Sequence, residues 1–179
     1  MVMKNTGIPW SVPMAVDDIP DSGLHVTLEA PREARSAVAE LAGLRDLPAL
    51  SAVFDLKREG AGVHVSGHVA ARVGQTCVVT LEPIENTVEE AIDVQFAPAS
   101  ATGSTPTRKR GRKDEEPPEP LVGDTLDLGV LATEFLILGM DPYPRQRGAE
   151  FAPPKPEDRS EHPFAALQSL KKPPGADQS

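Results

Sequence analysis

Two runs of alternating residues on either side of a glycine-rich turn restrict the fold of this chain more than any other feature. Residues 50–58 and 63–73 place apolar side chains at most alternate positions, and residues 59–62 (EGAG) separate them. A period of two is typical of a strand with one buried face, and a short glycine-containing connection predicts a hairpin. The side chains expected to point inward are Leu50, Ala52, Phe54, Leu56, Val63, Val65, Val69, Ala71 and Val73.

Two more strands are predicted on either side of this hairpin. Residues 24–30 and 87–96 alternate in the same way, and only Glu90 interrupts the inward row of the second run. Pro83 is expected to interrupt the ladder before it, because proline has no backbone donor. Four alternating strands with short connections favour an antiparallel sheet with one covered face.

The residues after Gly74 could continue the second hairpin strand. Without a bulge, Cys77, Val79 and Leu81 would keep the inward orientation, whereas a bulge at Gly74 would reverse it. The sequence therefore favours a buried Cys77 but does not decide between these two registers.

Two helices are predicted, one after Pro31 with a stop at Gly43, and one over residues 128–139 with Asp127 as its N-cap. Their apolar stripes are Ala34, Ala37, Val38 and Leu41 in the first, and Leu128, Leu131, Phe135 and Leu138 in the second. The second helix is so widely apolar that burial on most sides is expected. The predicted fold is α+β, with an antiparallel sheet of four or five strands and two packed helices.

Composition divides the chain further. Residues 98–120 hold prolines, charges and small polar residues without a hydrophobic pattern, which predicts a disordered insert. Residues 152–179 form a proline-rich tail with one short amphipathic piece at 162–171. We therefore predict a single domain over residues 1–151 that is interrupted by the insert and followed by the tail.

The net charge of −9 makes a nonspecific nucleic-acid binder improbable and favours a basic protein partner. No stretch approaches the about 20 apolar residues of a membrane-spanning helix, and the N-terminus lacks the apolar run of a signal peptide. One cysteine excludes an internal disulfide. These features predict a cytoplasmic protein without a membrane partner.

No residue set predicts catalysis, a metal or a cofactor. Cys77 has only Val78, Val79 and Thr80 beside it in sequence, and none of them is a base that could activate a thiol. A small buried residue is the favoured interpretation of Cys77, with a thiol enzyme as a weaker alternative. The four histidines show no ligand spacing, so we expect them at the surface.

Two charged features have two interpretations each. Glu134 lies on the apolar second helix, so its carboxylate either reaches a backbone or arginine partner, which we favour, or projects from the surface towards a ligand. The only strong basic cluster is either a solvated linker or a flexible arm that contacts RNA phosphates. Its residues, the candidate RNA contacts, are Arg108, Lys109, Arg110, Arg112 and Lys113.

Two distant segments together resemble the YceD family, the large ribosomal RNA subunit accumulation proteins. The residues that carry the resemblance are Cys77, Thr80, Leu81, Glu82, Pro83, Asp127, Leu128, Glu134, Leu136, Leu138, Pro142, Pro144 and Gly148. Many members have a second cysteine where this chain has Thr80, and this departure argues against a paired-cysteine metal or redox site.

The resemblance implies a bacterial, non-enzymatic factor for the synthesis, processing or stability of large-subunit (23S) ribosomal RNA. It implies no cofactor. The expected partner is a basic ribosomal or RNA-processing protein, with the basic cluster as a candidate contact to ribosomal RNA. The alternative function is a general protein-interaction adaptor that docks through residues 162–171 and has no link to ribosomes.

Overall fold

A computed structural model describes residues 8–98, 118–121 and 123–151 of the chain. A short 3₁₀ turn, Val16–Asp18, follows the first strand. The strands and helices in chain order are β1 (Pro13–Ala15), β2 (Leu24–Glu29), α1 (Arg32–Leu41), β3 (Asp46–Glu59), β4 (Gly62–Thr76), β5 (Pro83–Pro98), β6 (Glu119–Leu121), β7 (Thr125–Asp127) and α3 (Leu128–Gly139).

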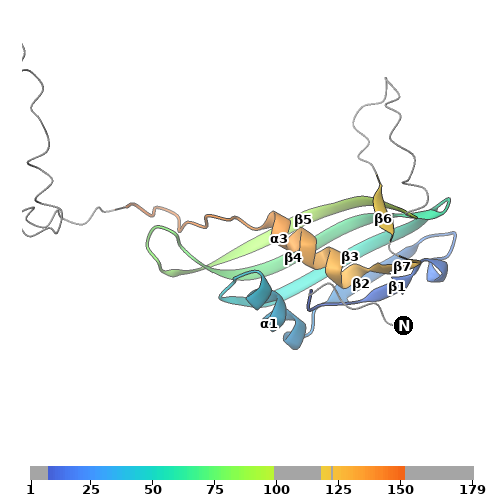
Figure 1. Cartoon of the computed structure of the whole chain (residues 1–179). Coiled ribbons are helices and arrows are strands. Elements are labelled where there is room, and N and C mark those ends of the chain that lie inside the picture. Colours follow the sequence, from blue (N-terminus) through green and yellow to red (C-terminus); the bar gives the residue numbers. More distant parts are fainter. Residues whose placement is uncertain (1–7, 99–117, 122, 152–179) are drawn as a thin grey trace, which may run out of the picture.

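One five-stranded sheet dominates the molecule, in the order β2-β3-β4-β5-β6 (Figure 1). The first four strands are antiparallel, whereas β6 runs parallel to the last three residues of β5. Strands β1 and β7 pair separately as a small antiparallel ribbon. These elements confirm the predicted α+β class with two helices and a five-stranded sheet.

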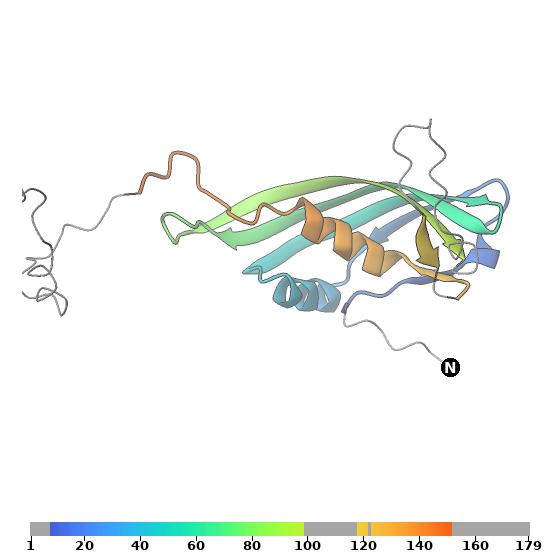
Figure 2. The same ribbon diagram turned by 45° about the horizontal axis from the view of Figure 1, so that its top comes forward.

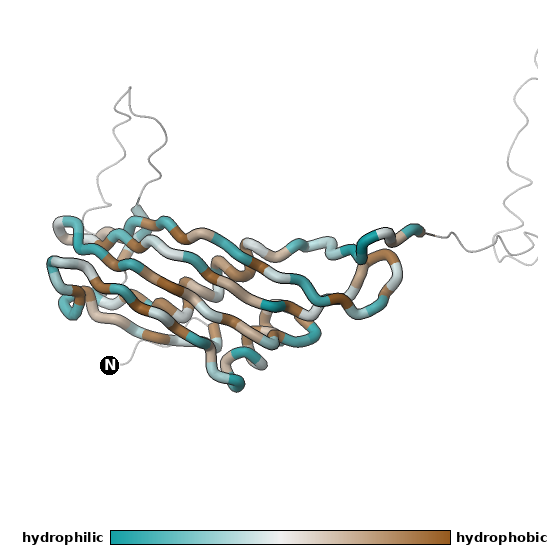
Figure 3. The backbone as a smooth tube through the Cα atoms, turned by 180° about the vertical axis from the view of Figure 1, so that it is seen from behind, coloured by the Kyte–Doolittle hydropathy of each residue, from teal (hydrophilic) through white to brown (hydrophobic). Residues whose placement is uncertain are grey.

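Both helices lie on the same face of the large sheet (Figures 1 and 2). The β1–β7 ribbon lies on the same side of the sheet, next to the start of α3 (Figures 1 and 2). Seen from behind, the strands lie in front and no described helix crosses them (Figure 3). We call this second side of the sheet, formed by β2, β3, β4 and β5, the uncovered face.

The predicted inward rows form the core. All nine side chains expected inward in the central hairpin are buried, and the register aligns them across the strands, as in the pairs Leu56–Val65 and Leu50–Ala71. Val88 and Ile92 of β5 continue these rows. Alternation alone therefore predicted which face of each long strand is buried, because the side-chain period of a strand is two.

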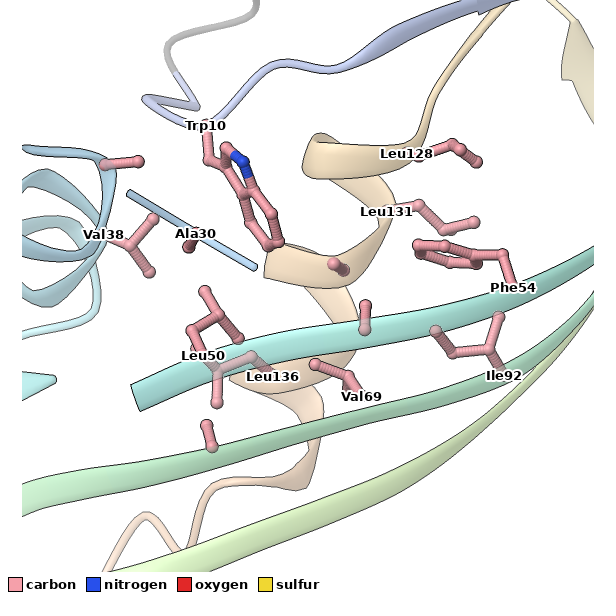
Figure 4. Packing of buried hydrophobic residues seen from close by; sticks show 14 of the residues in the cluster. Trp10, Ala30, Val38, Leu50, Phe54, Val69, Ile92, Leu128, Leu131 and Leu136 are labelled. Carbon is pink, nitrogen blue, oxygen red and sulfur yellow. The ribbon is translucent and has the colours of Figure 1, made fainter. Parts of the chain in front are cut away.

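Trp10 fills the space between α1 and α3 above the sheet (Figure 4). The segment that carries it runs against the start of α3, where Leu128 N–H donates to Val12 O at 3.0 Å. Gly129 allows this close approach, since a Cβ atom there would lie 2.7 Å from Trp10 O. The N-terminal segment is thus part of the core, which periodicity did not predict.

The end of the β4–β5 hairpin differs from the straight continuation of the strand that the sequence left open. Strand β4 ends at Thr76, so Val79 is half-buried and Leu81 is exposed, although Cys77 is buried as favoured. Pro83 begins β5 instead of interrupting it, a position where proline is tolerated because strand ends need fewer donors.

Two side chains of the predicted helical stripes are exposed. Leu41 and Leu138 each lie in the last turn of their helix and are 50% and 75% exposed. Near the end of α3, Gly139 lies against Val88 and Glu90 of β5 and leaves room for the Glu90 side chain. The missing side chain of Gly139 explains why Glu90 is tolerated in an otherwise apolar row.

The predicted insert has different limits in the structure. Pro98 belongs to β5 and Glu119–Leu121 forms β6, while residues 99–117 lie outside the described residues, as does the tail from 152. The proposed domain limits stay a prediction. No helix in the described ranges is long and apolar enough to cross a membrane.

Candidate functional site

The two sequence-distant groups of motif residues meet at one end of the sheet. Residues 77–82, which we call the thiol turn, connect β4 to β5, and the segment after α3 runs along them. Val78 N–H donates to Pro144 O at 2.9 Å, and Gln146 N–H donates to Cys77 Sγ at 3.3 Å. Backbone groups therefore hold the two segments together.

The thiol turn is closed by its own hydrogen bonds. Cys77 N–H donates to Glu82 O and Leu81 N–H donates to Cys77 O, both at 2.9 Å. Thr80 N–H points back to Cys77 Sγ at 3.4 Å. Leu81 has a φ of 62°, which is uncommon for a residue with a branched side chain, and it is 75% exposed.

The Cys77 thiol is stabilised as a thiolate without being accessible. Hydrogen bonds from Gln146 N–H, and then from Thr80, lower its pKa to about 6 against the opposing effect of burial. The side chain is shielded completely from water, and the groups bonded to sulfur are backbone amides and Thr80, none of which is a base. The sulfur is therefore buried inside the turn and is held by backbone amides of both segments.

Apolar side chains surround the thiol turn at the surface. Val78 and Leu81 project from the turn, and Tyr143 projects from the facing segment beside Pro144. Tyr143 is held locally, because its N–H donates to Asp141 Oδ1 at 2.8 Å. Pro144 itself is buried, whereas Pro142 is exposed.

Asp127 joins the small ribbon to α3. Its Oδ1 accepts from Gly129 N–H and Val130 N–H at 3.1 Å each, which makes it the predicted N-cap. The same oxygen accepts from Val12 N–H at 2.8 Å, and Oδ2 accepts from the Ser11 hydroxyl. One carboxylate therefore fixes both the helix start and the N-terminal segment.

Glu134 lies at the surface of α3. Its side chain is exposed, and no hydrogen bond or ion pair joins it to another described residue. Partial burial, and then the nearby charge of Glu119, raises its pKa. This geometry agrees with the surface alternative for Glu134 and provides no support for the arginine or backbone partner that the sequence favoured.

Histidine and carboxylate side chains lie on the uncovered face of the sheet. His25 Nδ1 lies 2.7 Å from Asp55 Oδ1, and His64 Nε2 lies 2.7 Å from Asp93 Oδ1. His68 is also exposed there, so the surface position predicted for these three histidines is confirmed; His162 lies outside the described residues. Within the described ranges no group of three His, Cys, Asp or Glu side chains could hold a metal ion.

The described residues carry 20 aspartates and glutamates against 8 lysines and arginines. Three of the arginines, Arg32, Arg35 and Arg45, line a hollow of about 480 Å³ beside α1, together with Glu40 and Asp46. Arg35 is occupied, because it donates to the carbonyls of Ala30 and Leu47. Acidic side chains therefore outnumber basic ones among the described residues.

The chain matches the family described as large ribosomal RNA subunit accumulation protein YceD over residues 65–171, which is more than half of its length. It belongs to the YceD family. No curated protein and no solved structure matches the chain. The YceD match begins within β4 and includes the thiol turn, α3 and the segment that carries Gln146.

The YceD motif residues divide into three places. Cys77, Thr80, Leu81, Glu82 and Pro83 build or flank the thiol turn, and Pro142 and Pro144 lie in the segment that faces it; Gly148 follows on that segment with a φ of 78°. Asp127, Leu128 and Leu136 fix α3, where both leucines are fully buried. Glu134 and Leu138 are exposed.

The basic cluster at 108–113 and the amphipathic piece at 162–171 lie outside the described residues, so their predicted roles stay predictions. Sequence reasoning missed Gln146, whose backbone N–H is the main partner of the Cys77 sulfur. No sequence signal could have found it, because any residue except proline can donate this bond.

Proposed function

We propose that this protein supports the accumulation of large-subunit ribosomal RNA as a binding factor that performs no reaction. Membership in the YceD family, whose description names this role, carries the proposal. The geometry is compatible with it, since the buried sulfur of Cys77 has amide partners and its position serves the turn.

The charge of the folded part supports a basic protein as the direct partner. A surface with 20 acidic and 8 basic side chains repels phosphate groups and attracts lysine- and arginine-rich proteins. Many proteins that assemble with ribosomal RNA are basic for the same electrostatic reason, because they neutralise phosphates. The partner would be a ribosomal or RNA-processing protein.

The basic cluster gives the chain a separate candidate contact with ribosomal RNA. Arg108, Lys109, Arg110, Arg112 and Lys113 lie between β5 and β6 in sequence. In this proposal the folded part binds the protein partner, and the cluster binds phosphates close to it.

Depletion of the protein tests the role itself. We expect the cellular ratio of large-subunit to small-subunit ribosomal RNA to fall, and to recover when the intact chain is supplied again. An unchanged ratio would favour the general adaptor over a ribosomal factor.

Affinity purification from lysate, with and without ribonuclease, tests whether the folded part binds a protein and the basic cluster binds RNA. We expect a basic ribosomal or RNA-processing protein to stay bound after ribonuclease treatment. A chain with glutamine at the five basic cluster positions should keep this protein and lose copurifying RNA. Loss of every ribosomal partner after ribonuclease would show that binding depends on RNA and would contradict the proposal.

A further inference from the structure

Strand β5 has a long outer edge. β4 pairs with β5 along almost its whole length, from Pro83 to Phe96. On the other side, β6 is the only described strand that pairs with it, and it covers only Phe96, Ala97 and Pro98 (Figures 1 and 2). Residues 84–95 therefore form a sheet edge. The backbone N–H and C=O groups on its outer side pair with no strand in the described part of the chain.

The side chains of this edge have one sign of charge. The 16 residues of β5 include Glu85, Glu89, Glu90 and Asp93 and no lysine or arginine. Glu85, Glu89 and Asp93 share the uncovered face, because they lie four positions apart and side chains at even spacings point to the same face of a strand. At about 3.3 Å per residue, successive carboxylates lie roughly 13 Å apart.

Neighbouring strands neutralise this row only in part. Asp93 contacts His64, and Glu85 lies 4.0 Å from Arg72, at the limit of an exposed ion pair. Glu89 faces Ala70 across the strand pair. The row thus keeps unbalanced negative charge beside the open backbone.

The negative charge of β5 disfavours some of the molecules that could bind this edge. A second copy of β5 would bring like charges opposite each other, which destabilises strand pairing. Nucleic acid is repelled for the same reason. The opposite edge of the sheet, β2, has six residues and only one carboxylate, Glu29, so it offers a shorter and less charged surface.

We propose that the outer edge of β5 binds an extended, lysine- or arginine-rich segment of a protein partner as an added strand. This inference rests on the proposed function and specifies how the basic partner is recognised. Backbone hydrogen bonds to residues 84–95 supply affinity that is independent of side chains, as in other cases of strand addition. Basic side chains on the uncovered side of the added strand then meet Glu85, Glu89 and Asp93, and favour a basic sequence.

A synthetic peptide of alternating lysine and threonine, about twelve residues long to match the open edge, tests this mode with the full chain. We expect binding by fluorescence anisotropy, and slower amide hydrogen exchange within residues 84–95 when the peptide is bound. Replacing two central threonines of the peptide by proline should abolish the added protection, because proline cannot pair along a strand.

A triple variant, Glu85→Gln, Glu89→Gln and Asp93→Asn, should weaken peptide binding roughly tenfold, if each exposed pair contributes a fraction of a kcal/mol. The matched control is Asp18→Asn, Glu33→Gln and Glu40→Gln, which removes the same charge from exposed positions outside β5. It should change the affinity by less than about twofold through the long-range field alone.

Three results would overturn the strand-addition mode. They are equal binding of the proline peptide, equal weakening by the control variant, and protection outside residues 84–95. Tighter binding of an RNA oligonucleotide than of the peptide at this edge would overturn it as well. Circular dichroism and urea unfolding should show that both triple variants fold.

The two proposals can fail separately. If depletion lowers the large-subunit ribosomal RNA but the β5 triple variant restores it fully, the family role stands and the edge inference is wrong. If the peptide binds β5 as expected but depletion leaves ribosomal RNA unchanged, the edge inference stands and the ribosomal role is wrong.

Discussion

Replacing Asp127 by alanine should destabilise the protein by about 2–3 kcal/mol. Losing an N-cap costs about 1 kcal/mol, and here the cap has two donors, Gly129 N–H and Val130 N–H. The variant also leaves the part-buried Val12 N–H without its 2.8 Å partner, which costs about 1–2 kcal/mol more. Against a typical total stability of about 5–15 kcal/mol, this is a large effect.

Asp127→Asn is the matched control, because an amide oxygen can accept from the same three N–H groups. It loses the charge near the helix N-terminus. Its amide NH2 replaces the oxygen that accepts from the exposed Ser11 hydroxyl, and this group can donate to that hydroxyl instead. We therefore expect a cost of about 0.5 kcal/mol. Urea unfolding followed by circular dichroism measures both values. If the alanine variant loses less than about 0.5 kcal/mol, or if both variants lose the same amount, Asp127 does not join the N-terminal segment to α3 as described.

Three further predictions concern single side chains. Thiolate absorbance at 240 nm should show a pKa of about 6 for Cys77 in the folded protein and a pKa near the ordinary thiol value in the unfolded chain. Because the folded-state pKa is lower, the thiolate stabilises the fold at high pH, and this contribution is lost as pH falls towards 6. A folded-state midpoint above 8 would contradict the hydrogen-bond account. Because the pKa of Glu134 is raised in the fold, its ionisation costs stability as pH rises from the ordinary glutamate pKa to the raised one, and this cost is complete at pH 7. Glu134→Gln should therefore add less than about 1 kcal/mol at pH 7 and nothing below the ordinary glutamate pKa, as measured by urea unfolding at both pH values. A stability loss at pH 7 would refute it. Gly129→Ala should cost about 1–3 kcal/mol by urea unfolding, because its Cβ would press on the backbone of Trp10, and an unchanged midpoint would show that the N-terminal segment moves freely.

The long strands could be predicted because alternation is a strong local signal. Each of β3, β4 and β5 has enough residues to show the period of two, and the face that each one buries was predicted correctly, although Val94 and Phe96 of β5 are only partly buried. Strands β1, β6 and β7 have three residues each, which is too short for any periodicity. Their positions depend on tertiary contacts, such as those of Trp10 and Asp127.

The candidate site was predictable only in part. The family resemblance identified the residues of the thiol turn, but not the contact between this turn and the segment after α3. That contact uses the Val78 and Gln146 amides, which carry no sequence signature. The open edge of β5 was equally hidden, because strand order is a property of the whole sheet and cannot be read from one strand.

Crosslinking of carboxylates to lysines in living cells, followed by mass spectrometry, tests most directly whether the folded part acts by binding a basic partner. We expect crosslinks from Glu85, Glu89 or Asp93 to lysines of a protein of the large ribosomal subunit or of its RNA-processing machinery. Crosslinks confined to proteins without any connection to ribosomes, or to a second copy of this chain, would contradict the account.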